Sequence, residues 1–442
     1  MPEYFPENNT PLKTDTEVRS LQKISSSLDN LSTGGAGSII GSFPTDAFGR
    51  LRTVAPLTLF DSYHRFQDNG LWSTFIAGTA SAVFNANQGL VDLNVNGTSG
   101  TELIRETTKV FAYQSGKSLL VMSTFVMNPA KDNLQQRVGY FGEWNGMYLE
   151  VHGSAVSLVE RTEVSGSIVE TFILQDDWNG DKLNGTGASG LTLDLTKAQI
   201  LWMDVEWLGV GTVRMGFVIN GQFIVCHSFH HANLLASTYI TTACLPLRYE
   251  IRNTGTTSGA SILKQICSTV ISEGGYSLRG DQQQINIPVT TPRTLTTAGT
   301  YYPVISIKLK TSPDRLDAIV IPTDISIIPT GTGTADYHWQ LIAGGTTIAG
   351  SWLSAGAISS VQYNITGTGL DPTTPGRILA GGFFSKTNQS SMSTRVNRED
   401  IFKFQLERNN IIGTPYELTL AITASDASSK VLASFDWEEV TR

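Results

Sequence analysis

Two acidic residues separated by one position, Asp204 and Glu206, are the clearest candidates for catalysis in this sequence. They fall in the run 200–207, which is rich in strand-forming residues, so alternation would place both carboxyl groups on one face about 7 Å apart. Two carboxyl groups at such a separation can serve as the acid and the base or nucleophile of a glycoside hydrolase. A solvent-facing strand edge explains the same spacing without catalysis.

Cysteine and histidine gather in the run Gln222–His231, which we expect to be a strand. Alternation predicts that one face carries Phe223, Val225, His227, Phe229 and His231. His227 and His231 would then lie about 13 Å apart along the strand, too far to share one ion. We therefore predict histidines satisfied at a strand end, with Cys226 and His230 beside them, and no metal site.

The run Asp177–Asn184 spaces oxygen-bearing side chains as a calcium loop does. Lys182 stands where an EF-hand has glycine, and Ala188 where it has its last acidic ligand. A loop built on Asx-turns explains the same residues. We favour that interpretation, with a single loop-bound calcium as the alternative, and expect no cofactor.

Aromatic side chains in expected loops are candidates for contact with sugars. Trp72, Trp144 and Trp178 stand near Asn and Asp, as sugar-stacking rings do. Tyr63 and Arg65 also fall in expected loops and could contact a sugar in the same way. The same residues suit a sandwich core or a subunit interface, which is the default interpretation. We name the three tryptophans as candidate glycan-binding residues.

The elements that must position these residues are mostly β-strands. The clearest runs before residue 280 are 119–126, 147–151, 168–174 and 200–207. Two Asn-Gly pairs, Asn145-Gly146 and Asn220-Gly221, predict two-residue hairpin turns because they tolerate positive φ angles. Together with long glycine-rich connections, this pattern predicts an antiparallel jelly roll or β-sandwich of the concanavalin type.

The N-terminal region has a different pattern. Residues 1–43 predict an extended arm with one short amphipathic helix, because Leu21, Ile24, Leu28 and Leu31 recur at helical spacing. The helix either packs on its own domain or serves in oligomerisation. Gly34–Gly37 is expected to end it.

The chain divides into three predicted parts: the arm (1–43), a jelly-roll domain (44–280) and a smaller C-terminal β-sandwich (281–442). The third part repeats the strand pattern, and the runs that predict its strands are 285–287, 301–310, 318–321, 326–328, 339–342, 402–406, 416–423 and 432–437. The fold class is therefore all-β apart from the arm.

Composition excludes several classes of protein. Charged residues make up 16% of the 442, against about 25% in an average chain. With 31 basic and 39 acidic residues the net charge is −8, which argues against a nucleic-acid binder. We expect neither a signal peptide nor membrane insertion, and the three cysteines, Cys226, Cys244 and Cys267, predict buried free thiols.

Three stretches resemble a group of virion structural proteins of tailed bacteriophages, common in marine and cyanobacterial phages. They are Asp46–Arg52 with Leu57–Asp61, Trp178–Gly190 with Leu193-Asp194, and Leu245–Asn253 with Cys267–Gly275. The resemblance covers roughly residues 40–280. It implies a non-enzymatic component of a virion, with a lectin-like jelly roll.

The resemblance sets the functional expectations. We expect a tail, baseplate or fibre-type protein that assembles with other virion proteins as a homotrimer and contacts host surface polysaccharide. Residues expected to assemble or anchor it are Leu21, Ile24, Leu28, Leu31, Phe48, Arg50, Arg52 and Phe60. A capsid decoration or head-fibre protein is an alternative that differs only in location.

A polysaccharide depolymerase is the alternative from another class. The pair Asp204 and Glu206 resembles the Glu-x-Asp-x-Glu strand of laminarinase-like glucanases, which share a jelly-roll fold. The first acid of that motif would stand at position 202, which is Trp202. The sequence therefore predicts no turnover.

Overall fold

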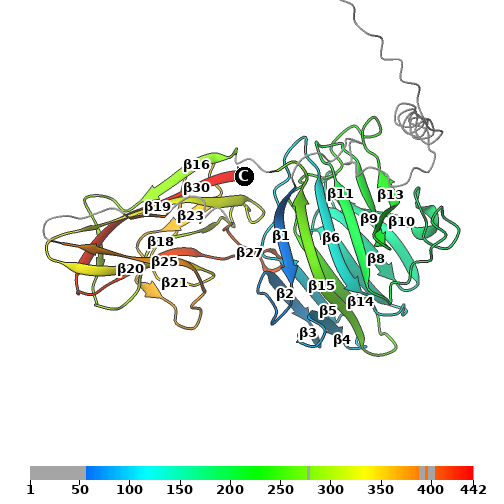
Figure 1. Cartoon of the computed structure of the whole chain (residues 1–442), viewed down its shortest axis with the longest axis horizontal. Coiled ribbons are helices and arrows are strands. Elements are labelled where there is room, and N and C mark those ends of the chain that lie inside the picture. Colours follow the sequence, from blue (N-terminus) through cyan, green and yellow to red (C-terminus); the bar gives the residue numbers. More distant parts are fainter. Residues whose placement is uncertain (1–55, 276–278, 388–393, 397–403, 442) are drawn as a thin grey trace, which may run out of the picture. The chain divides into compact units, whose positions relative to one another are not determined.

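The first large run of strands forms two antiparallel sheets whose facing sides make one hydrophobic core (Figure 1). The computed structural model describes residues 56–275, 279–387, 394–396 and 404–441. In these residues one sheet has the order β13-β12-β11-β6-β15-β4-β3, with β1 also paired to β15. Its strands are β1 (Leu57–Tyr63), β3 (Ala80–Asn85), β4 (Leu90–Val95), β6 (Leu119–Val126), β11 (Gln199–Val205), β12 (Val213–Ile219), β13 (Gln222–Phe229) and β15 (Ser261–Ser272).

The second sheet of this sandwich carries seven strands in the described residues, in the order β10-β9-β8-β7-β14-β5-β2. They are β2 (Trp72–Ala77), β5 (Glu102–Thr107), β7 (Leu134–Phe141), β8 (Gly146–His152), β9 (Ala155–Thr162), β10 (Val169–Leu174) and β14 (Leu247–Asn253). Alternate residues of both sheets, such as Val121, Leu201, Val138 and Leu247, fill the core. The predicted antiparallel jelly roll is therefore confirmed.

The chain after residue 280 forms a second antiparallel sandwich with its own core. One sheet contains β16 (Asp281–Asn286), β17 (Arg293–Leu295), β19 (Ile319–Thr330), β26 (Thr394–Val396) and β30 (Ser429–Thr441). The other has the order β22-β23-β18-β29-β20-β25, made of β18 (Tyr302–Leu309), β20 (Ala335–Ala343), β22 (Leu353–Ser354), β23 (Val361–Asn364), β25 (Arg377–Lys386) and β29 (Leu418–Ala424).

Short elements complete the described chain. Two ribbons pair β21 (Thr347–Ile348) with β24 (Gly369–Leu370) and β27 (Arg408–Asn409) with β28 (Thr414–Pro415). Helical structure among the described residues is limited to two single 3₁₀ turns, η1 (Gln175–Asp177) and η2 (Asn410–Ile412). The helix predicted in residues 1–43 lies outside the described residues.

The two Asn-Gly turns differ. Asn220 and Gly221 both have positive φ, 53° and 75°, and join β12 directly to β13, so this two-residue hairpin is confirmed. The connection before Gly146 is longer than predicted, because β7 ends at Phe141 and β8 begins at Gly146. The Gly142 N–H donates to the Asn145 carbonyl at 2.9 Å, which closes this longer turn.

Most predicted strands appear with shifted ends, and two predictions for the second sandwich were wrong. The runs 318–321 and 326–328 belong to one strand, β19, which bends through a register shift between Pro322 and Asp324. Residues 404–406 of the predicted strand 402–406 are not in a strand, although the Leu406 N–H donates to the Val320 carbonyl.

Residues 405–408 of the second sandwich contact residues 107–110 of the first, and all described residues belong to one compact unit. Arg408, 1% exposed, donates to the Thr107 carbonyl and pairs with Glu106 at 3.2 Å and Asp317 at 2.9 Å. Apolar contact is added by a small cluster that lies beside it: Val110, Ala112, Cys244, Ile319 and Ile321. We call this contact the junction.

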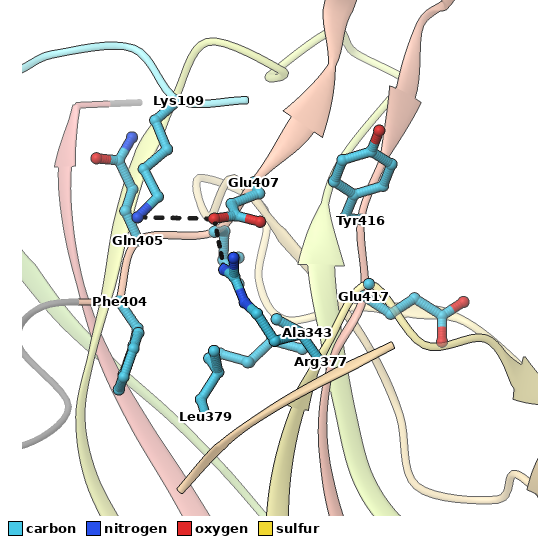
Figure 2. A pocket seen from close by; sticks show the side chains of 12 residues that line it. Lys109, Ala343, Arg377, Leu379, Phe404, Gln405, Glu407, Tyr416 and Glu417 are labelled. Carbon is cyan, nitrogen blue, oxygen red and sulfur yellow. Dashed lines mark hydrogen bonds and ion pairs between the residues drawn. The ribbon is translucent and has the colours of Figure 1, made fainter. Parts of the chain in front are cut away.

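A narrow pocket opens beside the junction (Figure 2). Glu407 accepts ion pairs there from Lys109 at 3.6 Å and from Arg377 at 3.3 Å. Burial lowers the pKa of Lys109, and the charge of Glu407 opposes that shift. Three charged residues of the pocket, Lys109, Arg377 and Glu407, are therefore paired with one another.

Candidate functional site

The seven-stranded sheet turns a charged surface away from its core. In β14, Leu247, Tyr249 and Ile251 enter the core, so the alternating Arg248 and Glu250 point to the opposite face. The neighbouring strands β5, β7, β8 and β9 show the same alternation. We call the resulting set the charged face: Glu102, Glu106, Gln135, Arg137, Glu150, Arg161, Glu170, Arg248, Glu250 and Arg252.

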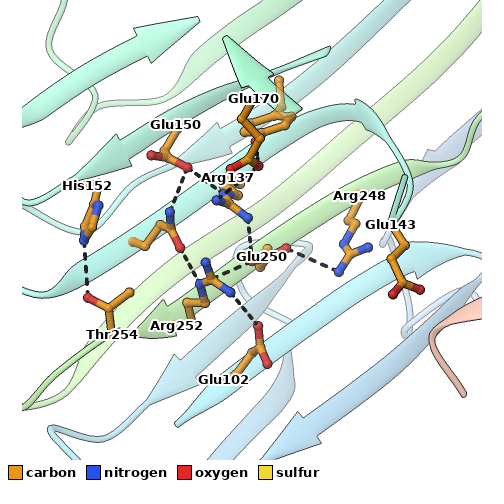
Figure 3. A network of polar contacts seen from close by, with 12 residues as sticks. Glu102, Arg137, Glu143, Glu150, His152, Glu170, Arg248, Glu250, Arg252 and Thr254 are labelled. Atoms are coloured by element: carbon orange, nitrogen blue, oxygen red, sulfur yellow. Dashed lines mark hydrogen bonds and ion pairs between the residues drawn. The ribbon is translucent and has the colours of Figure 1, made fainter. Parts of the chain in front are cut away.

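Arg137 lies at the centre of the charged face (Figure 3). It is in register with Glu250 on one side and Glu150 on the other, so the two acidic residues are about 10 Å apart at the backbone. Its guanidinium fills that gap, with Nε 2.6 Å from Glu150 Oε2 and Nη1 3.3 Å from Glu250 Oε1. One guanidinium thus bridges both carboxylates.

Further ion pairs extend the network across the sheet (Figure 3). Arg248 lies 3.3 Å from Glu250 and 3.6 Å from Glu106. Arg252 lies 3.7 Å from Glu250 and 3.8 Å from Glu102. Glu250 therefore receives three guanidinium groups, more than any single carboxylate needs for charge balance.

Aromatic rings lie among these cations. Phe141 and Tyr148 are fully buried, with ring centroids 4.4 Å apart. Arg137 and Arg161 each lie 5.2 Å from the Tyr148 centroid, and Arg248 lies 5.4 Å from that of Phe141. These are cation–π distances, so the rings and the ion pairs hold one another in place.

The pKa values of two carboxyl groups on the charged face, Glu250 and Glu102, are shifted in opposite directions. Burial by itself would raise the pKa of Glu250, but the charges of Arg248, Arg137 and Arg252 outweigh it and lower that pKa. Burial, together with the charge of Glu250, raises the pKa of Glu102. Acid–base pairs of enzymes are separated in this way. Here, however, Glu250 is buried under its guanidinium partners, where a substrate cannot reach it.

The two acids predicted from the sequence lie elsewhere. Asp204 is on β11 of the other sheet, fully buried, and is paired with Arg214. Glu206 follows the last residue of that strand and is buried too. Trp202, at the position of the missing acid, packs edge-on against Phe223 at 5.4 Å. Neither carboxyl group is open to a polysaccharide in this arrangement.

Two of the three candidate tryptophans belong to the core. Trp72 packs on Phe60 and donates its indole N–H to Ser62 Oγ at 2.8 Å. Trp178 is buried and donates to the Ile173 carbonyl at 3.1 Å. The structure thus gives these two the default role, and Trp144, 45% exposed, keeps a surface position.

The predicted single face of Gln222–His231 is interrupted by a β-bulge. The register shifts between Met215 and Gly216 on the partner strand, so Cys226 is the extra residue and enters the core. His227 accepts from the Asn179 N–H, and burial lowers its pKa to about 4. His231 Nε2 lies 2.6 Å from Glu160. Among the described residues no group of three or more His, Cys, Asp or Glu could hold a metal ion.

The oxygen-rich loop closes on its own backbone. Asp181 accepts from the N–H groups of Leu183 at 2.9 Å and Ser189 at 2.6 Å. Although burial acts to raise the pKa of Asp181, these hydrogen bonds lower it. A Cβ at Gly187 would lie 2.0 Å from Asp181 Oδ1, so the glycine permits this close turn.

Of the predicted assembly residues, only Phe60 is in the described part, since 1–55 lie outside it. Phe60 is buried on β1 and packs against Phe111 with ring centroids 5.0 Å apart. Cys226 and Cys244 are buried free thiols as predicted, whereas Cys267 is exposed. The prediction was wrong for Cys267, because its side chain lies on the face of β15 that is turned away from the sandwich core.

Sequence reasoning missed the charged face, although a signal for it exists. The run Leu247–Asn253 alternates apolar residues with Arg248, Glu250 and Arg252, and it lies in a stretch that carried the resemblance. In a half-buried strand this alternation marks a charged face.

Comparison with known proteins assigns the chain to no family. No family model matches the sequence, and no curated protein matches it. Among solved structures, a protein of unknown function from Shewanella oneidensis MR-1 is 11% identical, covering 61% of this chain and 98% of its own, with a TM-score of 0.33. The carbohydrate recognition domain of Emp47p is 10% identical, covering 50% and 97%, with a TM-score of 0.32. A beta-1,3-glucanase from Mycobacterium marinum is 7% identical, covering 48% and 98%, with a TM-score of 0.34.

Proposed function

We propose that this chain is a non-enzymatic structural component of a tailed-bacteriophage virion, of tail, baseplate or fibre type, that works as a homo-oligomer. The virion assignment rests on the sequence resemblance. The structural observation that carries the assembly claim is the edge strand β10. Its large apolar side chains Val169, Phe172 and Leu174 are 46–47% exposed.

Strand β10 lacks the features that keep an edge strand from pairing with other chains. Among the described residues it pairs only with β9, in unbroken register over six residues and without a bulge. It has no Lys or Pro, and its one acidic side chain, Glu170, is turned to Arg161 at 2.6 Å. Soluble monomers protect long apolar edges, so an edge of this kind is suited to a neighbouring subunit.

The distribution of charge supports the same conclusion. Charged residues are already scarce, and several of them, including Arg137, Glu250, Asp204 and Arg408, are buried in ion pairs. Fewer charges then need to lose water when the outer surface packs against another subunit. The same burial weighs against a depolymerase, because the strongest carboxylate candidates are enclosed.

The assembly claim is tested by light scattering across a concentration series. We expect the wild type to give about three times the mass of one chain and Phe172→Lys to shift towards the monomer, because an edge lysine opposes strand pairing. Phe66→Lys is the matched control, since Phe66 is 84% exposed but lies outside any strand. A wild type that stays monomeric at high concentration would refute the oligomer.

The virion claim needs a separate measurement. Mass spectrometry of purified particles from the phage that encodes the chain should find it as a stoichiometric component, and antibody labelling should place it on the tail or on the head. A chain found only in the infected-cell lysate would contradict the proposal, and labelling on the head would favour decoration or head-fibre placement.

A further inference from the structure

The second sandwich has a surface of a different kind on its six-stranded sheet. In β20, Tyr337, Trp339 and Leu341 enter the core, so His338 and Gln340 lie on the outer face. Strand β25 is paired in register with β20, and Phe383 stands opposite His338. This outer face therefore brings an exposed ring next to an imidazole.

Three rings form a row across the strands. The Phe383 and His338 centroids are 4.3 Å apart with ring planes at 35°, and His338 and Tyr301 are 5.8 Å apart at 73°. The Tyr301 hydroxyl shares a hydrogen bond with His338 Nδ1, which fixes the imidazole. Phe383 is 79% exposed, so its ring is open to solvent. We call these three residues the ring row.

The residues beside the ring row are polar or small, and Asp336, opposite Ser385, is the one acidic residue in the register positions next to it. Gly381 stands opposite Gln340, and across the next pairing Ala421 and Thr423 lie opposite Gln340 and His338. Gly381 has no side chain, and a Cβ there would meet the Trp339 carbonyl at 3.0 Å. We call Gln340, Gly381, Ala421 and Thr423, which bring an amide and a hydroxyl group to this face, the shelf.

We propose that the ring row and its shelf bind an uncharged polysaccharide. The C–H faces of a sugar ring stack on an aromatic side chain that has one open face, while its hydroxyl groups bond to amide, hydroxyl and imidazole groups. No Lys or Arg belongs to the ring row, and the carboxylate of Asp336 in the next register position would repel an acidic polymer. This surface is separate from β10, so the inference does not depend on the assembly claim.

A second copy of the chain fits this surface less well. A stable interface has an apolar core and buries about 800 Å² on each partner. Here the register positions next to Phe383 and His338 hold Gly381, Gln340, Ser385 and Asp336, which offer little apolar area. A single exposed ring beside polar groups instead matches a ligand that is apolar on its faces and polar at its edges.

The proposal is tested by affinity electrophoresis of the full chain through gels that contain dextran, laminarin, mannan or, as an acidic contrast, alginate. We expect retardation by at least one neutral polymer and not by alginate. Phe383→Ala should weaken the retardation at least tenfold. Ile378→Ala, on the same strand and 58% exposed, and Phe66→Ala should leave it unchanged.

Two further results would overturn the proposal. Equal retardation of the wild type and Phe383→Ala, or no retardation by any neutral polymer, would show that this surface does not bind the polysaccharide. Light scattering of Phe383→Ala should match the wild type, and a loss of oligomer would assign the ring row to a subunit contact instead. Failure of the β10 test leaves this experiment interpretable, because Phe172 and Phe383 are on different sandwiches.

Discussion

At the scale of single residues, the charged face shows how one sheet holds carboxyl groups of opposite behaviour. Glu250 is ionised more readily than an ordinary glutamate because three guanidinium groups outweigh its burial. Glu102 is ionised less readily, because burial and the nearby charge of Glu250 act together. The two residues must therefore contribute to stability with opposite dependence on pH.

The prediction follows from the signs of the two shifts. A lowered pKa means that Glu250 stabilises the fold above its unfolded-state pKa of about 4.3, and that this contribution is lost as the pH falls through its folded pKa. We expect Glu250→Gln to reduce the free energy of unfolding by about 2–3 kcal/mol at pH 7. The difference from the wild type should shrink in acid, as measured by urea denaturation from pH 7 to pH 3.

Glu102→Gln is the matched control at the same surface. With its raised pKa, the contribution of Glu102 is complete below about pH 4.3 and is lost as the pH rises through the folded pKa. This variant should therefore equal or exceed the wild type in stability at pH 7 and converge with it in acid. Parallel pH profiles for the two variants would contradict the opposed shifts.

At the scale of elements, the hairpin between β12 and β13 depends on two backbone conformations. Gly221 has a φ of 75°, and a Cβ added there would meet nothing within 4 Å, so only the backbone opposes a side chain. We expect Gly221→Ala to cost about 1–2 kcal/mol, the penalty of the left-handed region for an L-residue. Thermal denaturation measures the loss. Gly356→Ala, where a Cβ meets only Ser359 Cβ at 3.8 Å, should be close to neutral, and an equal loss would point away from the turn.

The elements also show where sequence reasoning succeeds. Period-two patterns locate strands such as β6 because alternation and strand propensity are local properties. Alternation within one strand can indicate a charged face, but which of its residues pair depends on the register of β7, β8 and β14. Arg137, for example, meets Glu250 across 113 residues of sequence. Pairings at that separation are decided by tertiary packing, so no local pattern reveals them. The bulge at Cys226 was not predicted for the same reason. One extra residue reverses the faces that alternation assigns to the residues after it.

At the scale of the whole molecule, the junction decides whether the two sandwiches unfold together. Arg408 takes its partners from both sandwiches: Glu106 and the Thr107 carbonyl at the end of β5 in the first, and Asp317 in the second. Burial raises the pKa of Glu106, with Arg408 and Arg248 acting against that rise. Two guanidinium groups thus balance the buried Glu106, that of Arg408 at 3.2 Å and that of Arg248 at 3.6 Å.

We expect Arg408→Ala to destabilise the chain by about 3–5 kcal/mol, because it leaves buried acceptors without their cation. Calorimetry should show one transition for the wild type and two for the variant. Arg377→Ala removes an ion pair whose arginine is 48% exposed, so it should cost less than about 1 kcal/mol and keep one transition. A single transition in Arg408→Ala would mean that the apolar contacts suffice.

The origin of these partners in both sandwiches also constrains the exchange of one sandwich for another during evolution. A recombination event that exchanged the second sandwich for another would bring its own residues to the place of Arg408 and Asp317 but keep Glu106. The hybrid would then leave the buried Glu106 with Arg248 as its remaining arginine partner. Exchanges that keep an arginine at the place of Arg408, or that keep Glu106 and Arg408 together, should therefore be tolerated better than those that do not.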